Sequence, residues 1–251
     1  MSKKLFTLGC SWTYGIGAGY NPGMPEKEYN TIFDNQQLAD EYSWRRYVKE
    51  HYQLENENFS LGGSSNDLQF RLASQYFMVA NSDVNYEGSI CIWGITSIYR
   101  KEWYDVKNKC YNNVMFSNDP KHNPAIAREY VLNHLDPTVE FKELAYKMQL
   151  WNAYFKSRGI INYWFDTFNS HNYGIPNDRM IFNGRDMLTL MTENTDTEYH
   201  KSRWYDKIDK RASIGIKKGL LNPISRHPTK EGYKEIARLV LDGIQRIEGG
   251  Q

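Results

Sequence analysis

The chain has 251 residues, and its 31 basic and 30 acidic side chains leave a formal net charge of +1. That balance excludes a strong overall field that would attract nucleic acid or an anionic membrane. The N-terminal Met1-Ser2-Lys3-Lys4 lacks the apolar stretch of a signal peptide, and no apolar run approaches the ~18 residues of a membrane span. The sequence therefore predicts a cytoplasmic protein with a single domain over residues 1–251.

Three short apolar runs have the length and composition of buried parallel strands: Leu5–Leu8, Ser89–Trp93 and Ile160–Phe165. A weaker fourth candidate is Asn58–Leu61. Apolar residues at helical spacing predict helices over residues 43–51, 67–80, 141–156 and 230–247, and Asn66 is a suitable N-cap for the second of them. Strands that alternate with helices predict an α/β fold, a three-layer α/β/α doubly wound parallel sheet.

Three stretches interrupt this alternation and are expected to form long loop insertions: residues 15–40, 104–137 and 171–221. The second contains a short helical pattern over residues 124–134. Loops of this length in a compact domain are usually functional covers or disordered segments.

Candidate catalytic residues lie near opposite ends of the chain. Ser11 follows the first predicted strand in Gly9-Cys10-Ser11-Trp12-Thr13, and His227 precedes the last predicted helix. Two more loops, residues 61–64 and 94–97, follow the second and third strands. Ligands of open α/β sheets bind at the carboxyl ends of the strands, so these segments are expected to converge at one sheet edge. A serine activated by a histidine base, with fixed N–H donors for an oxyanion, is suited to acyl transfer.

In this order the motifs resemble the four sequence blocks of the SGNH (GDSL-type) hydrolase superfamily, whose members are flavodoxin-like α/β/α proteins. The blocks are Gly-Asp-Ser-x-Thr/Ser, Asn-x-Gly-x-x-Gly, Gly-x-Asn-Asp and Asp-x-x-His-Pro. They are similar to Gly9–Thr13, Asn58–Gly63, Gly94–Ser97 and Ile224–Pro228. The resemblance implies Ser11 as nucleophile, His227 as base, and an oxyanion hole made by the Ser11 and Gly63 N–H groups with the Thr96 side chain. It implies no metal or organic cofactor, and the spacing of Cys10, Cys91 and Cys110 indicates reduced thiols without a metal site.

The sequence departs from the family pattern at two functional positions. Thr96 replaces the asparagine of the third block, which shortens the donor, although a hydroxyl can still donate. Ile224 replaces the aspartate that would orient the histidine, and loss of a triad acid reduces the rate by about 10⁴-fold. Ser225 or a main-chain carbonyl could orient the ring instead, with Asp166 and Asp178 as more distant candidates.

Each site residue also has a structural interpretation. Ser11 could cap a turn, His227 could simply precede a helix that begins at Pro228, and Gly63 could serve only a tight turn. His171 is a substitute candidate for the base. The glycines of Gly15–Gly19 do not have the spacing of a dinucleotide-binding loop.

Three further residues are candidates for substrate binding. Arg100 and Glu102, just after the third block, either form a structural ion pair at the crevice rim or contact substrate. Trp12 either belongs to an aromatic platform for a sugar ring or packs in the core.

The sequence thus predicts a serine esterase or deacylase that acts on a small acyl ester, with a carbohydrate O-acetyl ester as the first candidate. Acyl transfer to an acceptor other than water stays open. The alternative is a non-catalytic binding or structural protein on the same scaffold. The Asn- and Tyr-rich composition and the segment with Thr96, Arg100 and Glu102 resemble bacteriophage-encoded members of the superfamily, which implies the host cytoplasm as the location.

Overall fold

The computed structural model describes residues 2–115, 129–130, 133–168, 170, 173, 178–192 and 204–250, without the side chains of residues 115 and 204–210. His171 and most of the short helix predicted over residues 124–134 lie outside the described residues.

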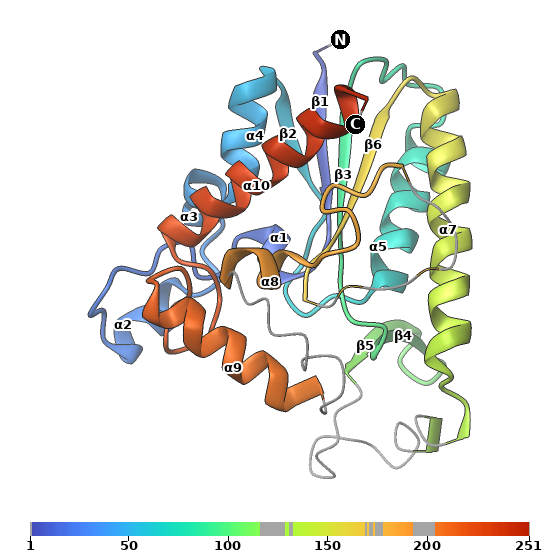
Figure 1. Cartoon of the computed structure of the whole chain (residues 1–251). Coiled ribbons are helices and arrows are strands. Elements are labelled where there is room, and N and C mark those ends of the chain that lie inside the picture. The colour runs from blue at the N-terminus through green and yellow to red at the C-terminus, as the bar shows by residue number, and fades with distance from the viewer. Residues whose placement is uncertain are drawn as a thin grey trace.

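A four-stranded parallel sheet forms the centre of the molecule (Figure 1). Its order is β2 (Glu55–Asn58), β1 (Lys4–Leu8), β3 (Ile90–Ile95) and β6 (Ile161–Asp166). The chain passes from β1 to one neighbour and then crosses to the other side of β1, so the strand order reverses between β1 and β3. In doubly wound sheets, the crevice at this reversal is where ligands bind.

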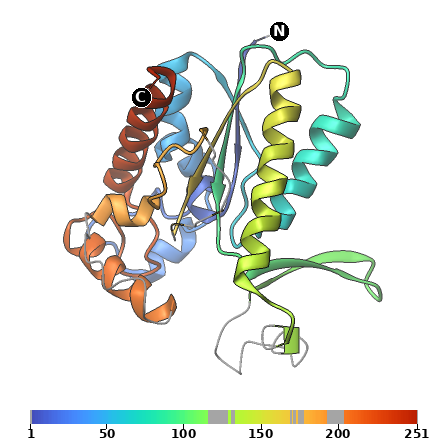
Figure 2. The ribbon, with the colours of Figure 1, turned by 45° about the vertical axis from the view of Figure 1, so that its right-hand side comes forward.

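The two faces of the sheet carry separate apolar cores, because successive strand residues point to opposite faces. Phe6, Leu8 and Trp93 enter the core under α5 (Asn66–Ala73), the π-helical η1 (Ser74–Ala80) and α7 (Pro137–Ser157). Leu5, Ile90 and Ile92 enter the core under α4 (Trp44–Tyr52), α8 (Met187–Thr192), α9 (Trp204–Lys217) and α10 (Lys230–Glu248). Figure 2 shows helices on both faces of the sheet, which confirms the predicted three-layer α/β/α architecture.

The weaker strand prediction, Asn58–Leu61, lies too far along the chain. The strand is β2 (Glu55–Asn58), a polar strand at the edge of the sheet, and the predicted residues after Asn58 belong to the turn that follows it. The N-cap of α5 is Ser65 rather than Asn66, since the Ser65 hydroxyl accepts the Leu68 N–H at 3.2 Å.

Part of the predicted loop regions is regular structure. Residues 15–40 contain α2 (Glu26–Ile32) and the beginning of α3 (Gln36–Tyr42), after the four-residue α1 (Ser11–Tyr14). An antiparallel hairpin, β4 (Arg100–Asp105) and β5 (Cys110–Met115), projects beside the lower end of α7 (Figure 2). The hairpin follows β3 in the chain, directly after the short loop that contains Thr96.

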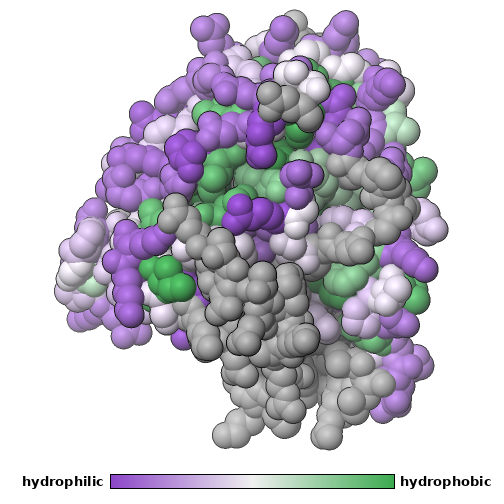
Figure 3. Space-filling view, in the orientation of Figure 1, coloured by the Kyte–Doolittle hydropathy of each residue, from purple (hydrophilic) through white to green (hydrophobic). Residues whose placement is uncertain are grey.

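Hydrophilic residues cover most of the described surface over α10 and α4 on the face in Figure 3. Within the described part of the chain, no helix combines the length and apolar composition needed to cross a membrane.

Candidate active site

Ser11 lies at the carboxyl end of β1, on a turn that is tied to α5 and to the loop before that helix. The Gly9 N–H donates to Gln69 Oε1 at 2.9 Å, and the Gly9 carbonyl accepts from the Ser64 hydroxyl at 2.7 Å. Cys10 then caps α1, of which Ser11 is the first residue. The Ser11 side chain is 7% exposed, and its hydroxyl makes no hydrogen bond to any described residue, His227 included.

Gly63 follows β2 in a conformation that requires glycine. Its φ angle is +71°, and a Cβ at this position would meet no atom within 4 Å. The Gly63 N–H donates to none of the described residues. A free N–H on an open turn beside the end of β1 is the donor that an oxyanion hole needs.

Thr96 follows β3 and is fixed by α5. Its N–H donates to Asn66 Oδ1 at 2.9 Å, and its carbonyl accepts from Asn66 Nδ2 at 3.0 Å. Thr96 is 1% exposed, and its hydroxyl is buried without a hydrogen-bond partner among the described residues. The structure thus brings Ser11, Gly63 and Thr96 to the carboxyl ends of β1, β2 and β3, which lie side by side in the sheet.

His227 lies in the loop before α10, and Ser225 contacts its ring. His227 Nδ1 and Ser225 Oγ are 3.0 Å apart. Ser225 Oγ also contacts Asn222 Oδ1 at 3.1 Å and the Tyr29 hydroxyl at 2.5 Å. Ser225 thus contacts the ring, as expected of a group that takes over the orienting role, and that role stays a prediction. Neither of the more distant candidates, Asp166 and Asp178, has a contact with His227 in the described structure.

The hydrogen bonds of this network favour one histidine tautomer. Asn222 Oδ1 accepts the Ser225 N–H at 2.7 Å, and Asn222 Nδ2 donates to the His227 carbonyl at 2.9 Å, so the amide orientation is set. The Ser225 hydroxyl has one proton, and its hydrogen bond to Asn222 Oδ1 uses that proton. Burial raises the pKa of Tyr29, so its phenol stays protonated and can donate to Ser225. In this arrangement His227 donates through Nδ1 to Ser225 Oγ, which also faces the His227 N–H at 3.4 Å, and Nε2 is the basic nitrogen.

The environment keeps His227 neutral. Burial lowers the pKa of His227 from 6.5 to about 4; a hydrogen bond to the Ser225 backbone opposes this shift, and the positive charge of Arg100 adds to it. A catalytic aspartate would act in the opposite direction, because a nearby negative charge stabilises the imidazolium. The site thus has the tautomer of a general base with an unusually low affinity for a proton.

Gly17 brings the histidine loop against the loop that begins at Ser11. Its φ angle is +85°, and a Cβ there would lie 2.8 Å from His227 Cβ and 3.0 Å from the Tyr29 hydroxyl. The His227 ring also packs edge-on against Phe33, with 5.5 Å between the ring centroids. Because Gly17 comes six residues after Ser11, residues from the two ends of the sequence meet at one site.

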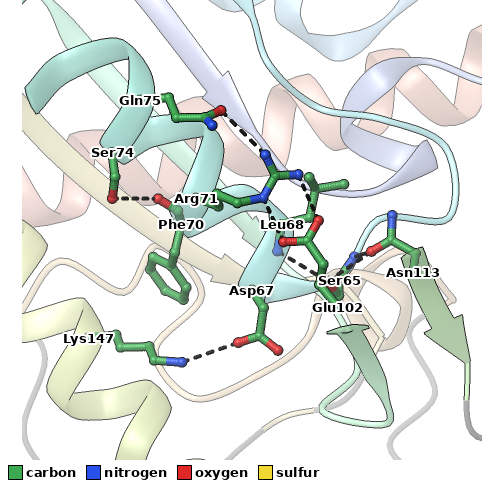
Figure 4. Close-up of polar contacts among 10 residues, drawn as sticks. All are labelled: Ser65, Asp67, Leu68, Phe70, Arg71, Ser74, Gln75, Glu102, Asn113 and Lys147. Atoms are coloured by element: carbon green, nitrogen blue, oxygen red, sulfur yellow. Dashed lines mark hydrogen bonds and ion pairs between the residues drawn. The ribbon is translucent and has the colours of Figure 1, made fainter. Parts of the chain in front are cut away.

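The three candidate substrate-binding residues have different environments. Trp12 is 5% exposed and packs edge-on against Phe168 at 5.2 Å, so it belongs to the core. Glu102 pairs with both Nε and Nη2 of Arg71, at 2.7 and 2.8 Å (Figure 4). The predicted pairing of Arg100 with Glu102 is therefore wrong, because Arg71 occupies both oxygens of the carboxylate. Arg100 is partly exposed at the start of β4.

Three described cavities lie away from Ser11 and His227. Two of them, with about 1040 and 1130 Å³ of empty space, share Asp178 and Arg179, and the first also borders Ile160 and Ile161 at the amino end of β6. A smaller one of about 300 Å³ lies between α5, α7 and the hairpin, and Arg100 contributes to its wall. Among the described residues, no group of three or more His, Cys, Asp or Glu side chains could hold a metal ion.

Sequence comparisons identify no relative of this chain: no family model matches, and neither does any curated protein. Several solved structures are similar in fold. A protein assigned to the lipolytic G-D-S-L family from Desulfitobacterium hafniense is 13% identical, over 98% of this chain and 99% of that one, with a TM-score of 0.41. The acetyl xylan esterase Est2A from the rumen bacterium Butyrivibrio proteoclasticus is 9% identical, over 99% of this chain and 64% of that one, with a TM-score of 0.43.

A third structure, a carbohydrate esterase family 2 enzyme with a carbohydrate-binding domain from a Corynascus fungus, is 8% identical. The match covers 98% of this chain and 67% of that one, with a TM-score of 0.48. The activity of this chain has to be inferred from its own site residues.

Proposed function

We propose that the chain is a serine ester hydrolase of the SGNH type, with Ser11 as nucleophile and His227 as general base. The observation that carries this proposal is the Tyr29–Ser225–Asn222 network around His227, whose hydrogen bonds favour the tautomer with a basic Nε2. A histidine that served only to begin a helix would need no such network around its ring.

In the proposed reaction, His227 Nε2 takes the proton of the Ser11 hydroxyl while Ser11 Oγ attacks the ester carbonyl. The N–H groups of Ser11 and Gly63 donate to the resulting oxyanion, and the Thr96 hydroxyl, buried without a partner, is a third donor. The imidazolium then protonates the leaving alcohol as the C–O bond breaks. Water, deprotonated by His227, releases the acyl group and regenerates Ser11.

The neutral network makes this a slow enzyme. Ser225, Asn222 and Tyr29 orient the ring but supply no negative charge to stabilise the imidazolium, and removal of a triad acid lowers the rate by about 10⁴-fold in a well-studied protease. The Ser11 hydroxyl is not bonded to His227 in the substrate-free chain. Catalytic hydrogen bonds are often long before substrate binds and shorten in the complex.

The expected acyl group is small, and a carbohydrate O-acetyl ester is the first substrate to try. Transfer to an alcohol acceptor uses the same acyl-enzyme and is part of the same proposal. A bacteriophage origin and a location in the host cytoplasm stay predictions from the sequence.

Hydrolysis of 4-nitrophenyl acetate tests the proposal. The wild-type chain should release nitrophenol faster than the buffer blank, and Ser11→Ala should return the rate to that of the blank. Ser74→Ala is the matched control, since the Ser74 hydroxyl only donates to a helix carbonyl at 2.8 Å. Equal rates for the wild type and Ser11→Ala would reject Ser11 as the nucleophile.

A non-catalytic binding protein is the second candidate, and two observations favour it: the unbonded Ser11 hydroxyl and the low pKa of His227. This alternative predicts no Ser11-dependent turnover of any acetyl ester. It also predicts that acetylated and deacetylated oligosaccharides bind unchanged to the Ser11→Ala variant.

A further inference from the structure

Arg100 carries a partly buried positive charge that forms no ion pair with a described residue. Its Nε and Nη1 are shielded from water and have no hydrogen-bond partner, and none of its guanidinium nitrogens is bonded to a described residue. The closest carboxylate along the strand, Glu102, is fully engaged by Arg71. An unpaired guanidinium is costly to bury, so a site that retains one usually receives an anion.

The Arg100 guanidinium lies near both proposed catalytic residues. Its Cζ is 5.8 Å from the centroid of the Phe168 ring, and that ring packs against Trp12, the residue after Ser11. Its charge also acts on the His227 ring. Arg100 is partly exposed as a residue, so part of its surface is open to a ligand. An anion on Arg100 would therefore be bound beside the reacting ester.

We propose that Arg100 binds a carboxylate group of the substrate, which makes the chain selective for esters that carry an anionic group close to the scissile bond. This inference rests on the proposed ester hydrolysis and names its substrate class. A guanidinium suits the role because it stays charged and donates in a planar fork that matches a carboxylate.

The bound carboxylate would also improve the base. It neutralises the charge of Arg100, and it brings a negative charge near His227, where the Tyr29–Ser225–Asn222 network supplies none. Both effects raise the pKa of His227 towards its ordinary value. A neutral ester of the same size provides neither effect and should react more slowly.

Two matched pairs of chromogenic esters test the selectivity. The first pair is mono-4-nitrophenyl succinate and its methyl ester, which places the carboxylate on the acyl side. The second is 5-acetoxy-2-nitrobenzoate and its methyl ester, which places it on the leaving group. For at least one pair, kcat/KM should favour the anion in the wild type, and Arg100→Met should reduce that preference by about tenfold or more, as expected for loss of a charge-assisted hydrogen bond.

Two variants serve as controls. Arg100→Lys keeps the charge and should retain part of the preference, which separates a charge effect from a folding defect. Lys234→Met removes a positive charge from an exposed ion pair with Glu231 at 2.7 Å on α10 and should leave the preference unchanged. A preference that is the same in the wild type and Arg100→Met for both pairs overturns the proposal.

Binding without turnover separates this inference from the proposed function. In Ser11→Ala with ¹³C-labelled histidine, succinate should raise the pKa of His227 by about one unit, read from the ring resonance. The same titration of the Ser11→Ala, Arg100→Met double variant should give no shift. If the shift depends on Arg100 and the wild-type chain has no esterase activity, the anion site is supported and the proposed function is rejected. Esterase activity in the wild type, with no succinate-induced shift in Ser11→Ala, rejects the anion site alone.

Discussion

Acidification should lower the stability of the folded chain through His227, and the size of this loss follows from the burial of the ring. The unfolded chain takes up a proton on this ring near pH 6.5, whereas the folded chain does so only near pH 4. Falling pH therefore favours the unfolded state, and this part of the stability is lost between about pH 6.5 and pH 4. Linkage gives a loss of about 2 kcal/mol between pH 7 and pH 5, which solvent screening at the partly exposed ring reduces to about 1–2 kcal/mol.

Urea denaturation followed by tryptophan fluorescence at pH 7, 6 and 5 measures this loss. The wild type should lose about 1–2 kcal/mol more than His227→Gln over this range, because all carboxylates are common to the two chains and cancel in the difference. His51→Gln is the matched control, since His51 is exposed on α4 and should follow the wild type. If the wild type and His227→Gln lose the same free energy between pH 7 and pH 5, His227 is not held neutral and the proposed network is wrong.

Three substitutions test other parts of the structure. Ser225→Ala releases the histidine ring and should lower kcat by about 10- to 100-fold with little change in KM, the effect of one lost buried hydrogen bond; an unchanged kcat would contradict the tautomer assignment. Gly63→Ala meets no neighbour but strains the backbone at a φ of +71°, so thermal denaturation should detect a loss of about 1–2 kcal/mol. Glu102→Gln leaves the Arg71 guanidinium unneutralised and should destabilise the fold by about 2–4 kcal/mol, whereas Lys147→Ala, in an exposed pair, should change it by less than about 1 kcal/mol. Equal effects of the last two would show that the buried pair contributes no more than the exposed one.

The central sheet could be predicted because its strands are short, apolar and separated by long amphipathic helices. β1 and β3 lie in the middle of the sheet and are buried on both faces, so their sequences are continuous apolar runs. β2 is an edge strand with the polar sequence Glu55–Asn58. Its residues are only partly buried, and a search for apolar runs therefore misplaced it towards Asn58–Leu61.

The positions of Ser11, Gly63 and Thr96 at one sheet edge could also be predicted, because parallel strands bring their following loops together. The partners of His227 could be predicted only in part. Ser225 is two residues away and was a candidate, but Tyr29 is separated from Ser225 by 196 positions. No local pattern joins such distant residues. The glycines of Gly15–Gly19 are visible in the sequence. The close approach of Gly17 to His227, which leaves no room for a side chain at position 17, is seen only in the structure.

Charge pairing was the least predictable feature. Arg100 and Glu102 both follow the third sequence block closely, and an ion pair at the crevice rim was one of the two alternatives for them. The position of α5 beside the hairpin brings Arg71 to Glu102 instead, and this packing depends on helix placement that sequence spacing does not encode (Figure 4). Because Glu102 pairs with Arg71, Arg100 has no hydrogen-bonded carboxylate among the described residues, which makes it a candidate anion site.

Covalent labelling tests the central claim most directly. A fluorophosphonate probe should form an adduct whose mass-spectrometric fragments locate the modification on Ser11, because only a serine activated by a base reacts readily with such a probe. Labelling should be abolished in Ser11→Ala and slowed in His227→Gln. An adduct on another residue, or no adduct on the folded wild-type chain, would contradict the assignment of Ser11 and His227 as nucleophile and base.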